Sequence, residues 1–140
     1  MKKHFRLLAL LIAISGTALH GAMLFAADDL EGVTWHLVEL NGAAPAPLPG
    51  GKQLSIMFDA NKKSAAGYNG CNNYFGQYEL QGQSLKFGPI ASTRRACPEA
   101  QSNIETKFMA ALEKTNSWEI KGGTLILLDG TNAFARFTIK

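Results

Sequence analysis

Residues 69–87 of the 140-residue chain read NGCNNYFGQYELQGQSLKF, and this stretch decides the fold class. The Asn-rich cluster 69–73 predicts a tight turn, because glycine and short polar side chains favour turn conformations. The runs 74–80 and 84–87 contain β-forming residues that alternate with polar ones, which predicts two strands joined by a Gln-Gly-Gln turn. Gly76 predicts a bulge in the first strand. The stretch therefore predicts a β-hairpin that follows a tight turn.

The same pattern continues on both sides of the hairpin. Short runs of β-forming residues alternate with turns rich in Gly, Asn and Asp. A Gly-Pro pair at 88–89 separates the hairpin from the next run. Further strands are predicted at 34–40, 54–58, 64–68, 90–93, 118–121, 124–128 and 134–139.

Two segments depart from the strand pattern. The segment 43–51 contains three prolines and is predicted to be an ordered surface loop or sheet edge. Within 98–115, Ile104, Phe108 and Leu112 recur every four positions, which predicts one amphipathic helix with a proline in its first turn. The predicted fold class is α+β, mainly β. It is a strongly curved antiparallel sheet or small β-barrel with this one amphipathic helix packed on or into it.

The N-terminus has the pattern of a secretory signal. Residues 1–27 combine a basic start, an apolar run at 7–14 and small residues, so we expect a signal peptide before a single domain at 28–140. The cleavage site stays open, and an uncleaved anchor over 7–27 is the alternative. After cleavage no stable transmembrane span is expected. Because no cysteine lies near the junction, we expect a periplasmic or secreted protein that is not a lipoprotein.

The positive charge of the chain belongs to this N-terminal segment. The full sequence carries a formal charge of +3, and Lys2, Lys3 and Arg6 account for all of it. From residue 28 onward, eleven Lys and Arg balance eleven Asp and Glu. The domain itself is therefore neutral, which argues against nucleic acid as its partner.

The chain contains two cysteines, Cys71 and Cys97, and both lie in the predicted domain. An even count in an exported protein favours a disulfide, while two free buried thiols are the alternative. The bond would link the Asn-rich turn to the start of the helix. We interpret it as a structural staple rather than as redox chemistry.

Three stretches of the sequence resemble the META/HslJ family of small secreted bacterial domains. They are LEGVTWHL at 30–37, NGCNNYFGQY at 69–78 and ASTRRACP at 91–98, and Glu105 and Phe108 follow at the places typical of the family's helix. The resemblance implies a compact β-barrel-like domain with one helix, found in heat-inducible envelope lipoproteins and secreted proteins. It implies an envelope or stress-related role. This chain departs from the lipoprotein members because it lacks a lipidation cysteine.

No catalytic, metal-binding or cofactor-binding set emerges from the sequence, and no cofactor is expected. His36 is the only histidine after residue 27, and one histidine without suitably spaced partners does not predict a zinc site. We expect it on the solvent side of its strand. The acidic residues that could act as bases show no pairing, and Gly-x-Ser-x-Gly is absent. These acidic residues are Glu39, Asp59, Glu79 and Glu99.

Two polar clusters are candidates for an interaction surface. Arg94 and Arg95 could contact an acidic partner or a lipid headgroup; alternatively, one is solvated and the other forms a salt bridge. Asn69, Asn72 and Asn73 could form a polar recognition edge, or they could satisfy the turn backbone around the first cysteine.

The aromatic residues are predicted to lie mostly in the core, because strand alternation directs them inward. If the barrel is incompletely filled, some of them could line an apolar pocket instead. The set comprises Trp35, Tyr68, Tyr74, Phe75, Tyr78 and Phe87.

The sequence favours a monomeric, non-enzymatic envelope or stress-related domain that binds an envelope protein or an apolar or lipid ligand. Two other hypotheses stay open. One is an inhibitor that presents the loop 43–51 to a secreted protease. The other is a hydrolase whose site is assembled from the dispersed carboxylates.

Overall fold

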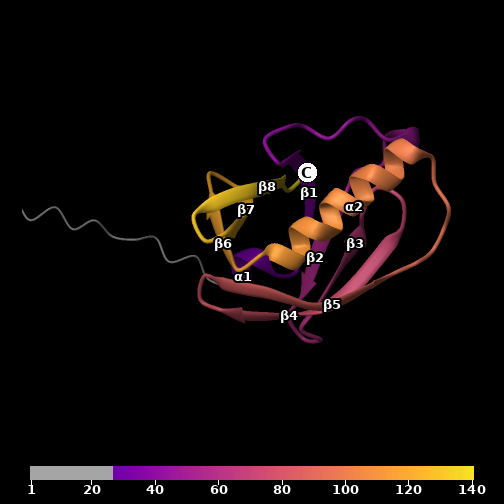
Figure 1. The fold of residues 1–140 in the computed structure, drawn as a ribbon. Coiled ribbons are helices and arrows are strands. Elements are labelled where there is room, and N and C mark those ends of the chain that lie inside the picture. Colours follow the sequence, from indigo (N-terminus) through magenta and orange to yellow (C-terminus); the bar gives the residue numbers. More distant parts are fainter. Residues whose placement is uncertain (1–26) are drawn as a thin grey trace, which may run out of the picture.

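The computed structural model describes residues 27–140 (Figure 1), so all but the last residue of the predicted signal peptide lies outside the described part. The described chain forms a mainly β fold with one long helix, as the sequence predicts. The helical elements are α1 (Ala27–Leu30), the 3-10 turn η1 (Pro49–Gly51) and α2 (Glu99–Lys114). The strands are β1 (Thr34–Leu40), β2 (Ser55–Asp59), β3 (Ser64–Tyr68), β4 (Asn73–Gln81), β5 (Ser84–Ser92), β6 (Ser117–Lys121), β7 (Thr124–Asp129) and β8 (Asn132–Thr138).

The eight strands of residues 27–140 follow one another in an antiparallel ring, and β8 pairs back with β1. The ring is not an even barrel. β4 and β5 pair from Tyr74↔Ser92 to Gln81↔Ser84, whereas β5 and β6 meet only at Ser84↔Ser117. The prediction of a curved antiparallel sheet is therefore confirmed. The number of paired residues differs between neighbouring strands, so the ring is closed unevenly.

The prediction of separate strands at 84–87 and 90–93 is wrong, because β5 runs through the Gly-Pro pair. Gly76 pairs with Ile90, and Tyr78 pairs with Phe87, so two residues of β5 oppose the single Gln77. This register shift is a bulge, and it places Pro89, which has no amide hydrogen, where the ladder is interrupted. The bulge that Gly76 predicted is thus present.

Helix α2 fills the ring from one side. Its apolar stripe buries Phe108, Ala111 and Leu112, as the four-residue repeat predicts. The Phe108 ring packs between Tyr74 of β4 and Phe137 of β8, with ring centroids 5.7 Å and 6.2 Å away. Because these two strands lie on different sides of the ring, one helix side chain joins them. Figure 1 shows α2 crossing the ring with β6 to β8 at one side and β5 at the other.

The predicted aromatic core is largely correct. Trp35 is 1% exposed and donates its indole N–H to the carbonyl of Leu30 at 2.9 Å, which anchors α1 to the ring. Phe58 packs edge-on against Tyr78 at 5.2 Å, inside the ring. These contacts place Trp35, Phe58 and Tyr78 in the core inside the ring.

Phe75 corrects the core prediction, because its side chain is 62% exposed. Strand alternation explains the difference: Tyr74 and Tyr78 of β4 face inward, and Phe75 faces outward with its cross-strand neighbours Ala66 and Ala91.

No helix within residues 27–140 is long and apolar enough to cross a membrane.

Candidate functional site

The turn between β3 and β4 is organised by Asn69. Its side-chain oxygen accepts the backbone N–H of Cys71 at 3.1 Å and that of Asn72 at 2.7 Å. Gly70 has φ +105°, and a Cβ at this position would lie 2.7 Å from Cγ2 of Ile104 in α2. A glycine is therefore required here, both for the backbone conformation and for the close approach of the turn to the helix.

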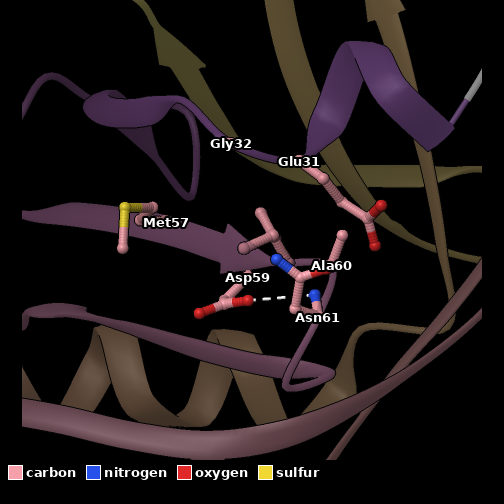
Figure 2. Close-up of a pocket in the computed structure, with 7 residues that line it drawn as sticks. Glu31, Gly32, Met57, Asp59, Ala60 and Asn61 are labelled. Atoms are coloured by element: carbon pink, nitrogen blue, oxygen red, sulfur yellow. Dashed lines mark hydrogen bonds between the residues drawn. The ribbon is translucent and has the colours of Figure 1, made fainter.

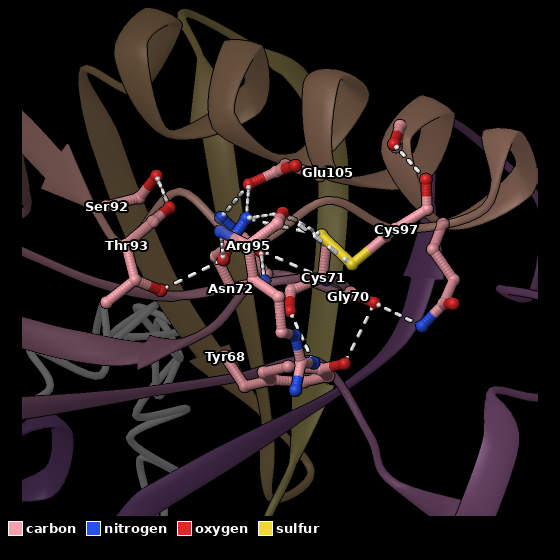
Figure 3. The surroundings of a disulfide bond; sticks show 12 residues. Tyr68, Gly70, Cys71, Asn72, Ser92, Thr93, Arg95, Cys97 and Glu105 are labelled. Carbon is pink, nitrogen blue, oxygen red and sulfur yellow. Dashed lines mark hydrogen bonds between the residues drawn. A yellow bond between two sulfur atoms is a disulfide. The ribbon is translucent and has the colours of Figure 1, made fainter.

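A disulfide joins this turn to the segment that leads into α2. Cys71 and Cys97 have a Cα–Cα distance of 5.9 Å, and they are the two cysteines of the chain (Figure 3). The predicted bond is thus present in the structure. Disulfides persist in oxidising compartments, so this one points to an extracellular or envelope location.

Asn72 is the centre of the hydrogen-bond network around the disulfide. Its side-chain oxygen Oδ1 accepts hydrogen bonds from the hydroxyl of Thr93 at 3.0 Å and from the backbone N–H of Arg95 at 2.8 Å. Its amide nitrogen donates to the Arg95 carbonyl at 3.2 Å and to Glu105 of α2 at 3.1 Å. Glu105 also accepts the Asn69 amide at 2.9 Å. One buried side chain thus connects the turn, the segment before α2 and α2 itself (Figure 3).

The candidate interaction residues therefore separate into two groups. Asn69 and Asn72 are buried at 0% and 5% exposure, and their polar atoms are used inside the network. Asn73, Arg94 and Arg95 are exposed. Arg95 donates from its guanidinium to the Cys71 carbonyl at 2.9 Å, and neither arginine belongs to the ion pairs found within residues 27–140.

Replacing Asn72 with Ala is expected to lower the free energy of unfolding by about 2 kcal/mol, because this buried side chain loses its hydrogen bonds to Thr93, Arg95 and Glu105. Replacing the neighbouring, exposed Asn73 with Ala is expected to change it by less than about 0.5 kcal/mol. Urea unfolding followed by tryptophan fluorescence measures both variants. Equal losses in the two variants would contradict the structural assignment of Asn72.

A second feature is an apolar groove of about 580 Å³ between the proline-rich loop and the first half of α2. One wall is the loop 43–49, and the other is formed by Ala100, Ile104 and Lys107, which lie on one face of the helix at spacings of four and three residues. The loop is held at its start by paired backbone bonds between Leu40 and Ala43. Lys107 is the only charged residue that lines the groove.

The sequence pointed to one wall of this groove only. The sequence predicts the loop 43–51 as a surface feature and assigns Ile104 to the apolar stripe of the helix. In the structure Ala100 is exposed and Ile104 is half-buried, because both line the open groove between the helix and the loop. No local signal joins two segments that lie more than forty residues apart in the chain.

A family model of the META domain matches residues 28–140. The chain belongs to the META domain family. The motif resemblance in the sequence is thereby confirmed over the whole predicted domain. No match was found among curated proteins.

Solved structures share the fold of this META domain. A protein from Burkholderia xenovorans, determined by NMR, matches with a TM-score of 0.64 and 22% identity, covering 94% of this chain and 99% of that one. A second NMR structure matches with a TM-score of 0.63 and 18% identity, covering 81% and 94%. A DUF4847 family protein from Bacteroides vulgatus matches with a TM-score of 0.58 and 15% identity, covering 79% and 94%. At these identities the likeness concerns the fold alone.

The four acidic residues considered as candidate bases do not gather in one place in the META domain. Glu39, near the end of β1, pairs with Arg136 at 3.1 Å. Asp59 lies at the opposite end of the antiparallel β1–β2 pair, where its side chain accepts the backbone N–H groups of Asn61 and Lys62 at 3.0 Å and 3.1 Å. Of the remaining predicted candidates, Glu79 faces Lys86 across the ladder and Glu99 begins α2.

A shallow depression next to Asp59 also contains Glu31, which the sequence analysis did not single out (Figure 2). Glu31 accepts the hydroxyl of Tyr78 and the ammonium of Lys63, the latter at 3.2 Å. Burial, followed by the bond to Glu31, raises the pKa of the Tyr78 phenol well above its ordinary value. These bonds connect the start of the domain to the turn between β2 and β3 and to β4, so Glu31 has a structural role.

His36 lies on the outer face of β1, because it alternates with the buried Trp35 and Leu37, and its side chain is half-buried there. Burial and, to a smaller extent, the nearby Lys140 lower the pKa of its imidazole below the ordinary 6.5. Its Nδ1 is buried and finds no hydrogen-bond partner among the described residues. Within residues 27–140, no group of three His, Cys, Asp or Glu side chains is placed to hold a metal ion.

Proposed function

We propose that this META domain is a non-enzymatic binding protein of the cell envelope, and that it holds a single acyl chain with an anionic end in the groove between the loop 43–49 and α2. The observation that carries the proposal is the groove itself, which is lined mostly by apolar residues of the loop together with Ala100 and Ile104 of α2, and which has one cation. The proposal includes export by the N-terminal signal, a periplasmic or secreted location and a monomeric state. A stress-related role follows from the family resemblance.

The size and lining of the groove support a small apolar ligand. Binding sites for such ligands are typically 300–1,000 Å³, mostly apolar, with a few polar groups that fix orientation. At about 580 Å³ the groove falls inside this range. Its polar lining residues are few, namely Asn41, Gln101, Asn103 and Lys107.

The position of Lys107 supports an anionic end on the ligand. No ion pair within residues 27–140 includes Lys107, and the neighbouring groove residues on its helix face, Asn103 and Ile104, are uncharged. A cation beside an apolar surface attracts a carboxylate or a similar group while its stem covers apolar atoms. A fatty acid or a lysolipid has this combination of features.

The placement of the acidic residues supports a non-enzymatic role. General acid–base chemistry needs groups within hydrogen-bond reach of one reacting atom. Glu39 and Asp59 lie at opposite ends of the β1–β2 pair, and each is already bonded to a neighbouring group. This arrangement gives the dispersed carboxylates structural tasks.

Filling the groove should weaken ligand binding. Ala100→Phe inserts a ring into the groove from an exposed helix position, and we expect it to weaken palmitate binding at least about tenfold, which corresponds to ~1.4 kcal/mol. Ala110→Phe is the matched control, because Ala110 is also an exposed alanine of α2 but does not line the groove. Its binding should change less than about twofold.

Tryptophan fluorescence with brominated palmitate, together with native mass spectrometry of the protein purified from its own host, measures this difference. Equal binding by wild type and Ala100→Phe would sink the proposal, as would the absence of any palmitate binding.

A further inference from the structure

A second, smaller pocket lies beside the disulfide and shares no lining residue with the groove. Its volume is about 240 Å³, and it is formed where four chain segments meet: the end of the proline-rich loop, the end of β3, the turn before β4 and the segment before α2. The lining residues are Lys52, Tyr68, Cys71, Asn72, Asn73, Thr93 and Arg95. We propose that this pocket binds the phosphate group of a phosphate monoester between Lys52 and Arg95.

The charge of the pocket is the first argument. Lys52 and Arg95 are its only charged lining residues, both are cationic, and no acidic side chain lines it. Neither cation belongs to an ion pair within the described chain. In a domain with balanced charges, two cations that line one pocket create a local positive potential, which Glu105 offsets only in part from the α2 side of Asn72, 3.1 Å from its amide nitrogen.

The second argument is that Arg95 is held in place before a ligand arrives. Its backbone N–H is bound by Asn72, its guanidinium donates one N–H to the Cys71 carbonyl at 2.9 Å, and the disulfide at Cys97 fixes the chain two residues later. Figure 3 shows the side chain reaching from the segment before α2 toward Tyr68. A fixed guanidinium loses little conformational entropy on binding, and its remaining donors suit the paired oxygens of an anion.

Lys52 is positioned by an aromatic ring. Its ammonium lies 3.9 Å from the centroid of Tyr68, in the range of a cation–π contact. The ring itself is anchored, because the Tyr68 hydroxyl donates to the Gly70 carbonyl at 2.9 Å. Both cations of the pocket are therefore attached to the rigid turn around the disulfide.

The chemistry of the pocket favours a phosphate monoester over a carboxylate. A monoester carries a charge of about −1.5 to −2 at neutral pH, which matches two cations, whereas a carboxylate carries only one negative charge. A volume of about 240 Å³ accommodates a phosphate and a small part of its ester, but not an acyl chain in addition. The ester could be a soluble compound or the headgroup of a lipid such as phosphatidic acid.

Titration of ¹⁵N-labelled protein with inorganic phosphate tests the inference, with sodium chloride at matched ionic strength as the reference. We expect phosphate-specific amide shifts centred on 52, 68–73 and 93–95. Lys52→Gln and Arg95→Gln should each weaken phosphate binding about tenfold or more. Arg94→Gln is the matched control, because it removes the same charge from the adjacent residue outside the pocket, and we expect a change of less than about twofold.

Lys52→Gln keeps the test valid even if Arg95→Gln destabilises the turn, because Lys52 makes no ion pair in the described chain. Vesicles of phosphatidylcholine with and without phosphatidic acid identify the source of the phosphate. Lys52-dependent binding to the phosphatidic acid vesicles indicates a lipid, and binding of inorganic phosphate alone indicates a soluble ester. No phosphate-specific shift and no such vesicle binding, or equal effects of Arg94→Gln and Lys52→Gln, would overturn the inference. Ala100→Phe should leave phosphate binding unchanged, which separates this pocket from the groove.

Discussion

Replacing Cys71 and Cys97 together with Ser is expected to lower the free energy of unfolding by about 3–4 kcal/mol. The bond closes a loop with a sequence separation of 26 and lowers the conformational entropy of the unfolded chain. Without the bond the unfolded chain regains this entropy, which gives the stated magnitude. The folded state loses a further constraint, because the bond joins the turn at 69–73 to the chain entering α2. Guanidinium unfolding monitored by circular dichroism measures the change.

Reduction provides the control for this prediction. A reductant should destabilise the wild-type protein by a similar amount and leave the double Ser variant unchanged. Thiol counting on the denatured protein should find free thiols only after reduction. Two free thiols in the unreduced protein, or a loss below about 1 kcal/mol, would show that the disulfide does not stabilise the domain as proposed.

Replacing Phe108 with Ala is expected to destabilise the domain by about 3–5 kcal/mol, the range for large-to-small changes of buried aromatic residues. Phe108 is 0% exposed and touches the rings of Tyr74 and Phe137 from two sides of the strand ring. The truncation leaves a cavity where α2 joins these strands, and the ring cannot close over it without moving the helix.

The matched control lies on the exposed side of the same helix. Glu113→Ala should change the free energy of unfolding by less than about 0.5 kcal/mol, because this side chain is exposed. Thermal and urea unfolding measure both variants. If Phe108→Ala lowered the free energy of unfolding by no more than about 1 kcal/mol, the packing of α2 against the strands would not stabilise the ring as the structure indicates.

Much of the fold follows from local patterns. Alternation predicted the strands, and the four-residue repeat predicted α2 to within one residue at each end. The errors occur where pairing outweighs local propensity. β5 continues through Pro89 because a bulge against β4 leaves that position outside the regular ladder, and Phe75 faces outward because the register of β4 fixes its inner face on Tyr74 and Tyr78.

The candidate sites were less accessible to sequence analysis. The cysteine pair could be predicted from its even number and the predicted export signal, and the structure contains the bond. The central role of Asn72 could not, since it depends on Thr93, Arg95 and Glu105, which become neighbours only after folding. The groove likewise combines the loop 43–49 with one face of α2, and each was interpreted separately as a surface feature and as a core stripe.

The disulfide network and the groove are physically connected. The bonds from Asn69 and Asn72 to Glu105 fix the first half of α2 against the turn, and this half of the helix supplies one wall of the groove. The buried polar cluster therefore determines the position of the proposed binding surface without forming part of it.

The most direct test of acyl-chain binding is a ¹⁵N NMR titration of residues 28–140 with palmitate below its aggregation concentration. We predict saturable shifts concentrated at 40–48 and 100–107, with the Lys107 amide among them and little change at 118–128. In Ala100→Phe the same shifts should need at least about tenfold more palmitate to saturate. Shifts centred elsewhere on the domain, or no saturable shifts at all, would contradict the account of the groove as the binding site.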